Sequence, residues 1–168
     1  DAIFNFAKLS FELGFDNDAI KSFQLIEKSS PYYNESQNLL TRIFINTRDY
    51  DVALNYLRNM ADKTLKMKET HQKIAYLRGV QLYNDNDMAN AIKLFIESIK
   101  IGINQETLAL SHFWKAEALF KKEAFDKSIN EFLEFNMVEK TINKLPSNSS
   151  IGVSNYGIGY CYLKKEDY

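Results

Sequence analysis

The stretch GVQLYNDNDMANAIKLF, residues 79–95, contains the pattern that decides the fold. An apolar pattern of helical period leads into a turn of Asn and Asp residues at 84–87. After the turn, the small residue Ala91 is followed by Ile92, and the bulky Phe95 lies four positions beyond Ala91. Asp and Asn are natural caps for a following helix. The stretch therefore predicts a helix, a tight turn and a second helix.

The same pattern occurs four times along the chain. Its small residues, separated by 34, 38 and 37 positions, are Ala19, Ala53, Ala91 and Ser128. The bulky residues four positions after them are Phe23, Leu57, Phe95 and Phe132. A turn rich in Asp and Asn precedes each, and a fifth such turn, 165–168, stands at the end of the sequence. Self-similarity at this spacing is typical of a repeat protein.

Apolar residues of helical period flank every turn, and strand-like alternation is nowhere sustained. In the first unit, one helix face is expected to carry Ile3, Phe6, Ala7, Ser10 and Leu13. The helices are expected at 2–13, 17–29, 34–47, 50–62, 68–84, 88–101, 105–121, 125–138 and 151–164. The polar stretch at about 140–150 is predicted to be a surface loop.

The composition agrees with an all-α fold. Six glycines and two prolines in 168 residues are too few for the turns of a β-sandwich or barrel, and a hydrophobic content of 45% is ample for a core. The net charge of −1 gives no reason to expect a nucleic acid or an anionic membrane as partner. No apolar run approaches the ~18–20 residues of a membrane span. A single cysteine, Cys161, excludes an intrachain disulfide framework.

This arrangement resembles the tetratricopeptide repeat family, whose unit is a helix–turn–helix of 34 residues. The first unit matches at Phe6-Ala7, Gly14, Ala19, Phe23 and Pro31, and the third at Gly79, Leu82, Ala91, Phe95 and Ser98. The stretch 113–117 in the fourth is similar to the start of many bacterial repeats. The resemblance implies a right-handed α-solenoid of about four and a half antiparallel helix pairs. The units are expected at 1–33, 34–66, 67–104, 105–146 and, in part, 147–168, as a fragment of a longer bacterial protein.

Two packing expectations accompany the repeats. The shared core is expected to hold Phe6, Phe23, Phe44, Phe95 and Phe132. Gly159 is expected to be the small residue at the helix crossing of the fifth unit.

Signals for catalysis or metal binding are weak. His71 and His112 have no zinc-ligand spacing near them, and Ser111 and His112 are neighbours on a helix, so they do not face each other. Cys161 is expected to be a packed thiol. Residues 85–87 resemble the start of a calcium loop, but the glycine and glutamate that such a loop needs are missing. We therefore predict no enzyme activity, no metal and no cofactor.

The first helix of every unit but the second carries a second apolar stripe with a spacing of seven residues, which keeps its members on one side of the helix. In the resembled family, these positions face the concave inner surface. On that basis the groove is expected to contain Phe4, Lys8, Phe11, Asn38, Arg42, Ile45, Tyr76, Val80, Tyr83, Phe113, Glu117, Phe120, Tyr156, Tyr160 and Leu163. A competing interpretation is that many of these rings pack against the neighbouring helix instead.

An aromatic groove suits an extended or helical peptide. The leading hypothesis is therefore a non-enzymatic protein–protein interaction module that binds a peptide or protein segment along first helices. One alternative is a structural spacer or scaffold, and another is a repeat region attached to an enzyme outside this sequence. The sequence leaves the partner, the compartment and the oligomeric state open.

Overall fold

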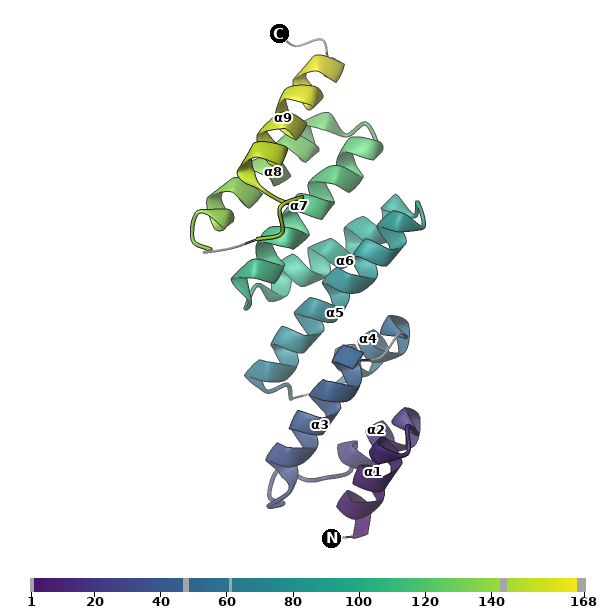
Figure 1. The fold of residues 1–168 in the computed structure, drawn as a ribbon. Helices are drawn as coiled ribbons and strands as arrows, with labels where there is room; N and C mark the ends of the chain where they lie inside the picture. The colour runs from purple at the N-terminus through teal and green to yellow at the C-terminus, as the bar shows by residue number, and fades with distance from the viewer. Residues whose placement is uncertain (1, 47–48, 61, 143–144, 166–168) are drawn as a thin grey trace. The chain divides into compact units, whose positions relative to one another are not determined.

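A computed structural model describes residues 2–46, 49–60, 62–142 and 145–165. In this part of the chain the fold is all-α, with no strand (Figure 1). The helices are α1 (Ala2–Glu12), α2 (Asp16–Gln24), α3 (Tyr33–Asn46), α4 (Tyr50–Asn59), α5 (Leu65–Asn84), α6 (Met88–Ile101), α7 (Gln105–Lys121), α8 (Phe125–Glu139) and α9 (Ile151–Lys165).

Most helix positions agree with the sequence prediction, and the differences lie at helix ends. α2 ends at Gln24, not at 29, and α4 ends at Asn59, not at 62. The apolar period that suggested a longer α2 continues to Ile26, but this side chain is buried from the connecting segment. The apolar period alone does not show whether Ile26 belongs to the helix or to the segment that follows it. The predicted turn at 165–168 lies mostly outside the described residues, as does residue 48 of the second turn.

The helices that follow the turns begin with two kinds of N-cap. Asp49 and Asp87 are N-caps whose carboxylates accept hydrogen bonds from the backbone N–H of Val52 and Asn90, as expected. α2 and α8 instead have Phe15 and Ala124 at the cap, without a side-chain bond. Their acidic residues lie in the first turn, where negative charge is stabilised by the helix dipole.

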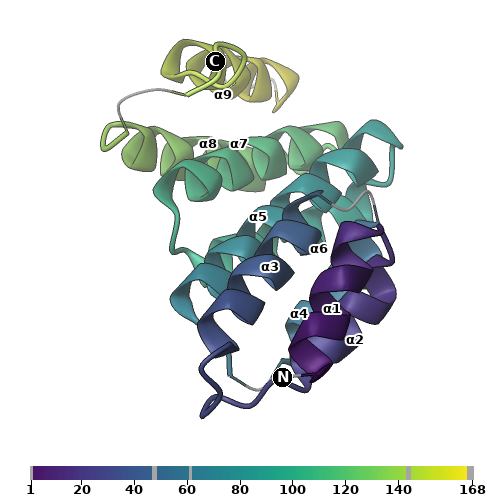
Figure 2. The ribbon, with the colours of Figure 1, turned by 60° about the horizontal axis from the view of Figure 1, so that its bottom comes forward.

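The chain forms two compact units, residues 1–70 and 71–168, and the boundary falls within α5. In the first unit α1 pairs with α2, and α3 packs against α2. In the second unit α7 and α8 lie side by side, and α9 packs against α8 and contacts α7 (Figure 2).

The core of the first unit corrects the face predicted for α1. The structure buries Phe4, Ala7 and Ser10, whereas Phe6 is 56% exposed and Ile3 and Leu13 are also exposed. The reason is that α2 lies on the side of α1 that carries Phe4. The prediction that Phe6 belongs to the core was wrong. Fully buried rings are, as expected, Phe23, Phe44, Phe95 and Phe132.

Glycines permit close helix contact at two places. A Cβ on Gly79 would lie 2.6 Å from the ring of Phe95, and one on Gly157 would lie 2.7 Å from the ring of Phe132. A Cβ on Gly159 would meet no atom within 4 Å. The crossing glycine of α9 is therefore Gly157, and the prediction for Gly159 was wrong. Gly157 and Gly159 are two residues apart and therefore point about 200° away from each other around the helix axis. Only one of them can face α8.

A buried glutamine fixes the connection between α6 and α7. The Oε1 atom of Gln72 accepts hydrogen bonds from the backbone N–H of Ile103, at 3.1 Å, and of Asn104, at 2.8 Å. The Nε2 atom of Gln72 donates to the backbone carbonyl of Asn104 at 3.0 Å. The backbone carbonyl of Gln72 accepts a hydrogen bond from the hydroxyl of Ser98. These bonds satisfy the polar groups of the loop and hold it against α5.

Candidate functional site

The histidines and Ser111 form hydrogen bonds with other side chains or the backbone of the fold. His71 Nε2 lies 2.7 Å from Glu97, and His112 Nδ1 lies 2.8 Å from Glu131. Ser111 lies within hydrogen-bond distance of the Ser98 hydroxyl and of the Thr107 carbonyl. Among the described residues, no group of three or more His, Cys, Asp or Glu side chains is placed to hold a metal ion.

The single thiol is also a packing group. Cys161 is fully buried, and its Sγ donates to the hydroxyl of Ser128 at 3.5 Å. Burial raises the pKa of this thiol and outweighs the hydrogen bond with Ser128, which lowers it, and the charge of Glu117 adds to the rise. A raised pKa lowers the fraction of reactive thiolate, so the side chain is suited to packing and not to nucleophilic attack.

In the first unit Phe4 is only 3% exposed, and its ring stacks on Tyr32 with centroids 4.6 Å apart. Phe4 is therefore a core residue, because the connection after α2 covers the side of α1 that was expected to be open.

Contacts between α1 and α3 involve three further predicted positions of the first unit, Lys8, Phe11 and Arg42. The ammonium of Lys8 on α1 forms an ion pair with Glu35 on α3 at 3.2 Å. The guanidinium of Arg42 lies over the ring of half-buried Phe11, 5.3 Å from its centroid. Of these two contacts, the one between Arg42 on α3 and Phe11 on α1 joins two predicted positions.

The third helix of this unit contributes two exposed positions. Asn38 accepts a hydrogen bond from Lys66 at 2.9 Å, and Ile45 is partly open to solvent. Both therefore lie on the surface, with one of them bonded to the start of α5.

In the second unit, α5 presents three half-buried positions, Tyr76, Val80 and Tyr83. The ring of Tyr76 contacts Phe95 at 6.4 Å, and burial raises the pKa of its phenol. The ring of Tyr83 lies edge-on to Trp114 at 5.1 Å. These contacts support the competing interpretation, in which part of the stripe packs between helices.

Phe113 was predicted to line the groove, and this was wrong. It is 3% exposed, and its ring lies within 6 Å of the rings of Trp114, Phe132 and Phe135. α8 covers the side of α7 that carries Phe113, so the residue is part of the core of the second unit.

Glu117 is a half-buried acid beside Tyr83 and Lys121. Burial raises the pKa of its carboxyl, although the charge of Lys121 and the hydrogen bond from Tyr83 oppose that shift. Burial likewise raises the pKa of Tyr83 to about 12, and the negative charge of Glu117 adds to the effect. The ammonium of Lys121 lies 4.0 Å from the centroid of Tyr83 and completes the cluster.

The last predicted positions form a run of rings from α7 to α9. Half-buried Phe120 contacts Tyr160 at 5.6 Å, and Tyr160 stacks on Tyr156 at 6.0 Å with an interplanar angle of 13°. Tyr156 is 72% exposed, and Leu163 and Tyr160 are also open to solvent.

Three residues that the sequence reasoning missed belong to this surface. Trp114 contacts Tyr83, Lys121 lies over the same ring, and the ammonium of Lys164 lies 5.6 Å from the centroid of Tyr160. Lys121 and Lys164 each follow a predicted residue by four positions, so helical spacing would have found them. We call Tyr83, Phe120, Tyr156 and Tyr160, together with Lys121 and Lys164, the aromatic face.

No protein-family model matches the sequence, and no curated protein matches it. In the described part of the chain, none of the helices combines the length and apolar character needed to cross a bilayer.

Proposed function

We propose that this chain is a non-enzymatic interaction module that binds a peptide or protein segment on the aromatic face of its second unit. The observation that carries the proposal is the run of rings from Phe120 through Tyr160 to the exposed Tyr156. Tyrosine gives a large contact area at a small entropic cost and tolerates a wet surface, so exposed tyrosines are frequent anchors for partners.

The charges on this surface suggest the chemistry of the partner. The ammonium of Lys121 lies over the ring of Tyr83, and that of Lys164 lies over the ring of Tyr160. A segment that inserts apolar side chains between the rings and carries a carboxylate near either lysine would match both features. We infer a short, apolar and acidic peptide segment as the ligand.

We also infer that the helix pairs are tetratricopeptide-type repeats of a right-handed solenoid. Two features support this inference. Gly14, Asn86 and Glu123 share one turn position and all have positive φ. Gly79 and Phe95 meet as a small residue and a bulky ring sixteen positions apart, and the same spacing recurs at Ala7 with Phe23 and at Ala116 with Phe132.

The proposal can be tested by selecting peptides from a random display library on the whole chain and measuring their affinity by fluorescence polarisation. The double variant Tyr156→Ala with Tyr160→Ala should weaken binding by at least about tenfold, because two anchor rings are lost. Tyr162→Ala is the matched control, since Tyr162 is an exposed tyrosine of α9 outside the aromatic face, and it should bind like the parent.

Two results would contradict peptide binding at this surface. One is a library that enriches no acidic, apolar sequence, which would favour the spacer hypothesis. The other is equal loss of affinity in the double variant and in the Tyr162 control.

A further inference from the structure

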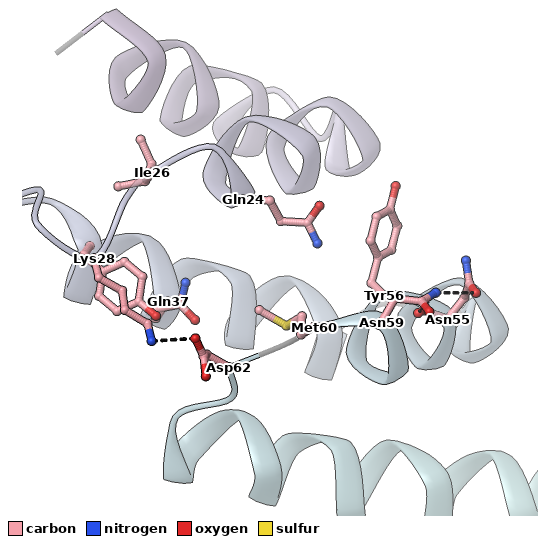
Figure 3. Close-up of a pocket in the computed structure, with 10 residues that line it drawn as sticks. Gln24, Ile26, Lys28, Gln37, Asn55, Tyr56, Asn59, Met60 and Asp62 are labelled. Carbon is pink, nitrogen blue, oxygen red and sulfur yellow. Dashed lines mark hydrogen bonds and ion pairs between the residues drawn. The ribbon is translucent and has the colours of Figure 1, made fainter.

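The first unit contains a cavity between α2, α3 and α4, apart from the aromatic face of the second unit. Its volume is about 490 Å³, within the range of small-ligand sites. Figure 3 shows the side chains of Gln24, Gln37 and Tyr56, which come from α2, α3 and α4 respectively, around this space.

Carboxamides dominate the polar lining of the cavity. They come from Gln24, Gln37, Asn55 and Asn59. Each amide carries both hydrogen-bond donors and an acceptor and has no charge. The charged residues of the lining, Lys28 and Asp62, form an ion pair at 2.7 Å and so neutralise each other.

Gln37 supplies the observation that points to a ligand. The residue is 8% exposed, and its Oε1 atom is buried without a hydrogen-bond partner among the described residues. A buried acceptor left unpaired costs about 1–3 kcal/mol. The atom itself has almost no exposed surface, but its residue lines the cavity, so rotation of the Gln37 side chain toward that space would bring the oxygen to an O–H or N–H group of an occupant and remove the penalty.

The two asparagines of α4 are oriented by each other. The Nδ2 atom of Asn59 donates to the backbone carbonyl of Asn55 at 2.9 Å and to its Oδ1 at 3.2 Å. This arrangement leaves Asn55 Nδ2 as a donor and Asn59 Oδ1 as an acceptor. The cavity therefore offers donors and acceptors from more than one helix.

Apolar surfaces complete the lining. The rings of Tyr33 and Tyr56 are half-buried, and Ile26 and Met60 add aliphatic contact. The ring of Tyr56 stacks on the buried ring of Phe44, with centroids 6.4 Å apart. A ligand that fits must thus combine polar edges with apolar faces.

We propose that this cavity binds a neutral carbohydrate of one or two sugar rings. Hydroxyl groups both donate and accept, so they match the amides, and one of them would donate to Gln37 Oε1 once that side chain turns toward the cavity. The C–H faces of a pyranose would pack on the tyrosine rings and Met60.

Other ligand classes fit the lining less well. An anion or cation would find the charges of Lys28 and Asp62 already paired. An extended peptide is bound by polar groups that lie in a line along its backbone. The amides of this cavity come instead from three helices and surround a single space.

The test uses the whole chain and nuclear magnetic resonance titrations with glucose, galactose, N-acetylglucosamine, maltose and cellobiose at millimolar concentrations. At least one sugar should shift the side-chain amide signals of Gln37, Asn55 and Asn59. Asn59→Ala should weaken this binding by about tenfold, whereas Asn130→Ala, an exposed asparagine of α8, should leave it unchanged.

Gln37→Leu separates binding from folding. This variant removes the unpaired oxygen at nearly constant volume, so its melting temperature without sugar should rise. The same variant should lose the sugar-induced shifts. Because these changes lie in the first unit, they leave the aromatic face of the second unit intact, and the peptide assay remains an independent readout.

Clear results would overturn the proposal. If no sugar shifts the amide signals, or if Asn59→Ala and Asn130→Ala behave alike, the cavity does not bind carbohydrate. If adenosine or a neutral dipeptide such as glycylglycine shifts these signals and the sugars do not, the ligand class assigned here is wrong.

Discussion

Glu123 has a backbone conformation that its residue type disfavours. Its φ is 58° in the turn between α7 and α8, where the corresponding turns have Gly14 and Asn86. The left-handed region costs an ordinary L-residue about 1–2 kcal/mol, whereas glycine adopts it freely. We predict that Glu123→Gly raises the free energy of unfolding by about 0.5–1 kcal/mol, measured by urea denaturation.

The control for this change is Glu134→Gly, at an exposed position inside α8. There the helix gains nothing from glycine and loses about 1 kcal/mol of stability. Equal effects of the two substitutions would contradict the assignment of strain to Glu123.

Glu131 connects α8 to α7 through two partners. Its carboxylate accepts from Lys115 at 2.6 Å and lies 2.8 Å from His112 Nδ1, and all three side chains are largely buried. Burial acts to raise the pKa of Glu131, but the hydrogen bonds and charges of His112 and Lys115 outweigh it, so the pKa is lowered. A lowered pKa in the folded state means that the charged carboxylate stabilises the fold.

We predict that Glu131→Gln lowers the free energy of unfolding at pH 7 by about 1.5–3 kcal/mol. The difference from the parent should be complete above the ordinary glutamate pKa and should close as the pH falls through the lowered pKa. Denaturation curves at several pH values measure this. Glu134→Gln, an exposed neighbour, should show neither effect. A difference that persists at low pH would show that the charge is not responsible.

At the level of the element, α9 is positioned by one of its glycines. A Cβ at Gly157 would lie 2.7 Å from the buried ring of Phe132, and α9 must shift to accept it. We predict that Gly157→Ala lowers stability by about 1–3 kcal/mol through overpacking. Gly159→Ala, where a Cβ has free space, should raise it by about 0.5–1 kcal/mol through helix propensity. Thermal unfolding of the two variants should therefore give opposite shifts, and shifts of the same sign would contradict this packing.

The positions of the helices along the chain were predictable from local signals. The sides on which the helices pack against one another were not. Period and turn residues determine where a helix lies, so most of the nine described helices were predicted to within a few residues. They do not determine which side of a helix another element covers. For that reason Phe4 and Phe113 were assigned to the groove instead of the core, and Gly159 was chosen instead of Gly157.

Of the two candidate sites, the sequence could indicate the one on a single helix but not the one formed by several helices. The spacing of seven residues identified Tyr156 with Leu163, and Tyr160 lies between them, four positions after Tyr156 on the same side of a single helix. The carboxamide cavity had no such signal, since Gln24, Gln37 and Asn59 belong to three helices that meet only in the folded unit. Convergence of this kind depends on tertiary packing, which one sequence does not specify.

At the level of the whole molecule, the surface of α1 has a large apolar stripe. Its side chains Ile3, Phe6, Leu9 and Leu13 are about half exposed or more. The corresponding stripe of α3 contains Leu40 and Ile43, which are fully buried, and α2 packs against α3. An uncovered stripe of this kind favours association.

We predict that the chain self-associates as its concentration rises, and that Phe6→Lys with Leu13→Lys abolishes this. The variant keeps the fold, because both side chains are exposed. Asn5→Lys with Glu12→Gln changes the net charge by the same amount without removing apolar surface, so it controls for repulsion between copies. Sedimentation equilibrium should show a concentration-dependent mass for the parent and for this control, and a monomer for the first variant. A monomeric parent, or equal loss of association in both variants, would show that the stripe does not drive contact between molecules.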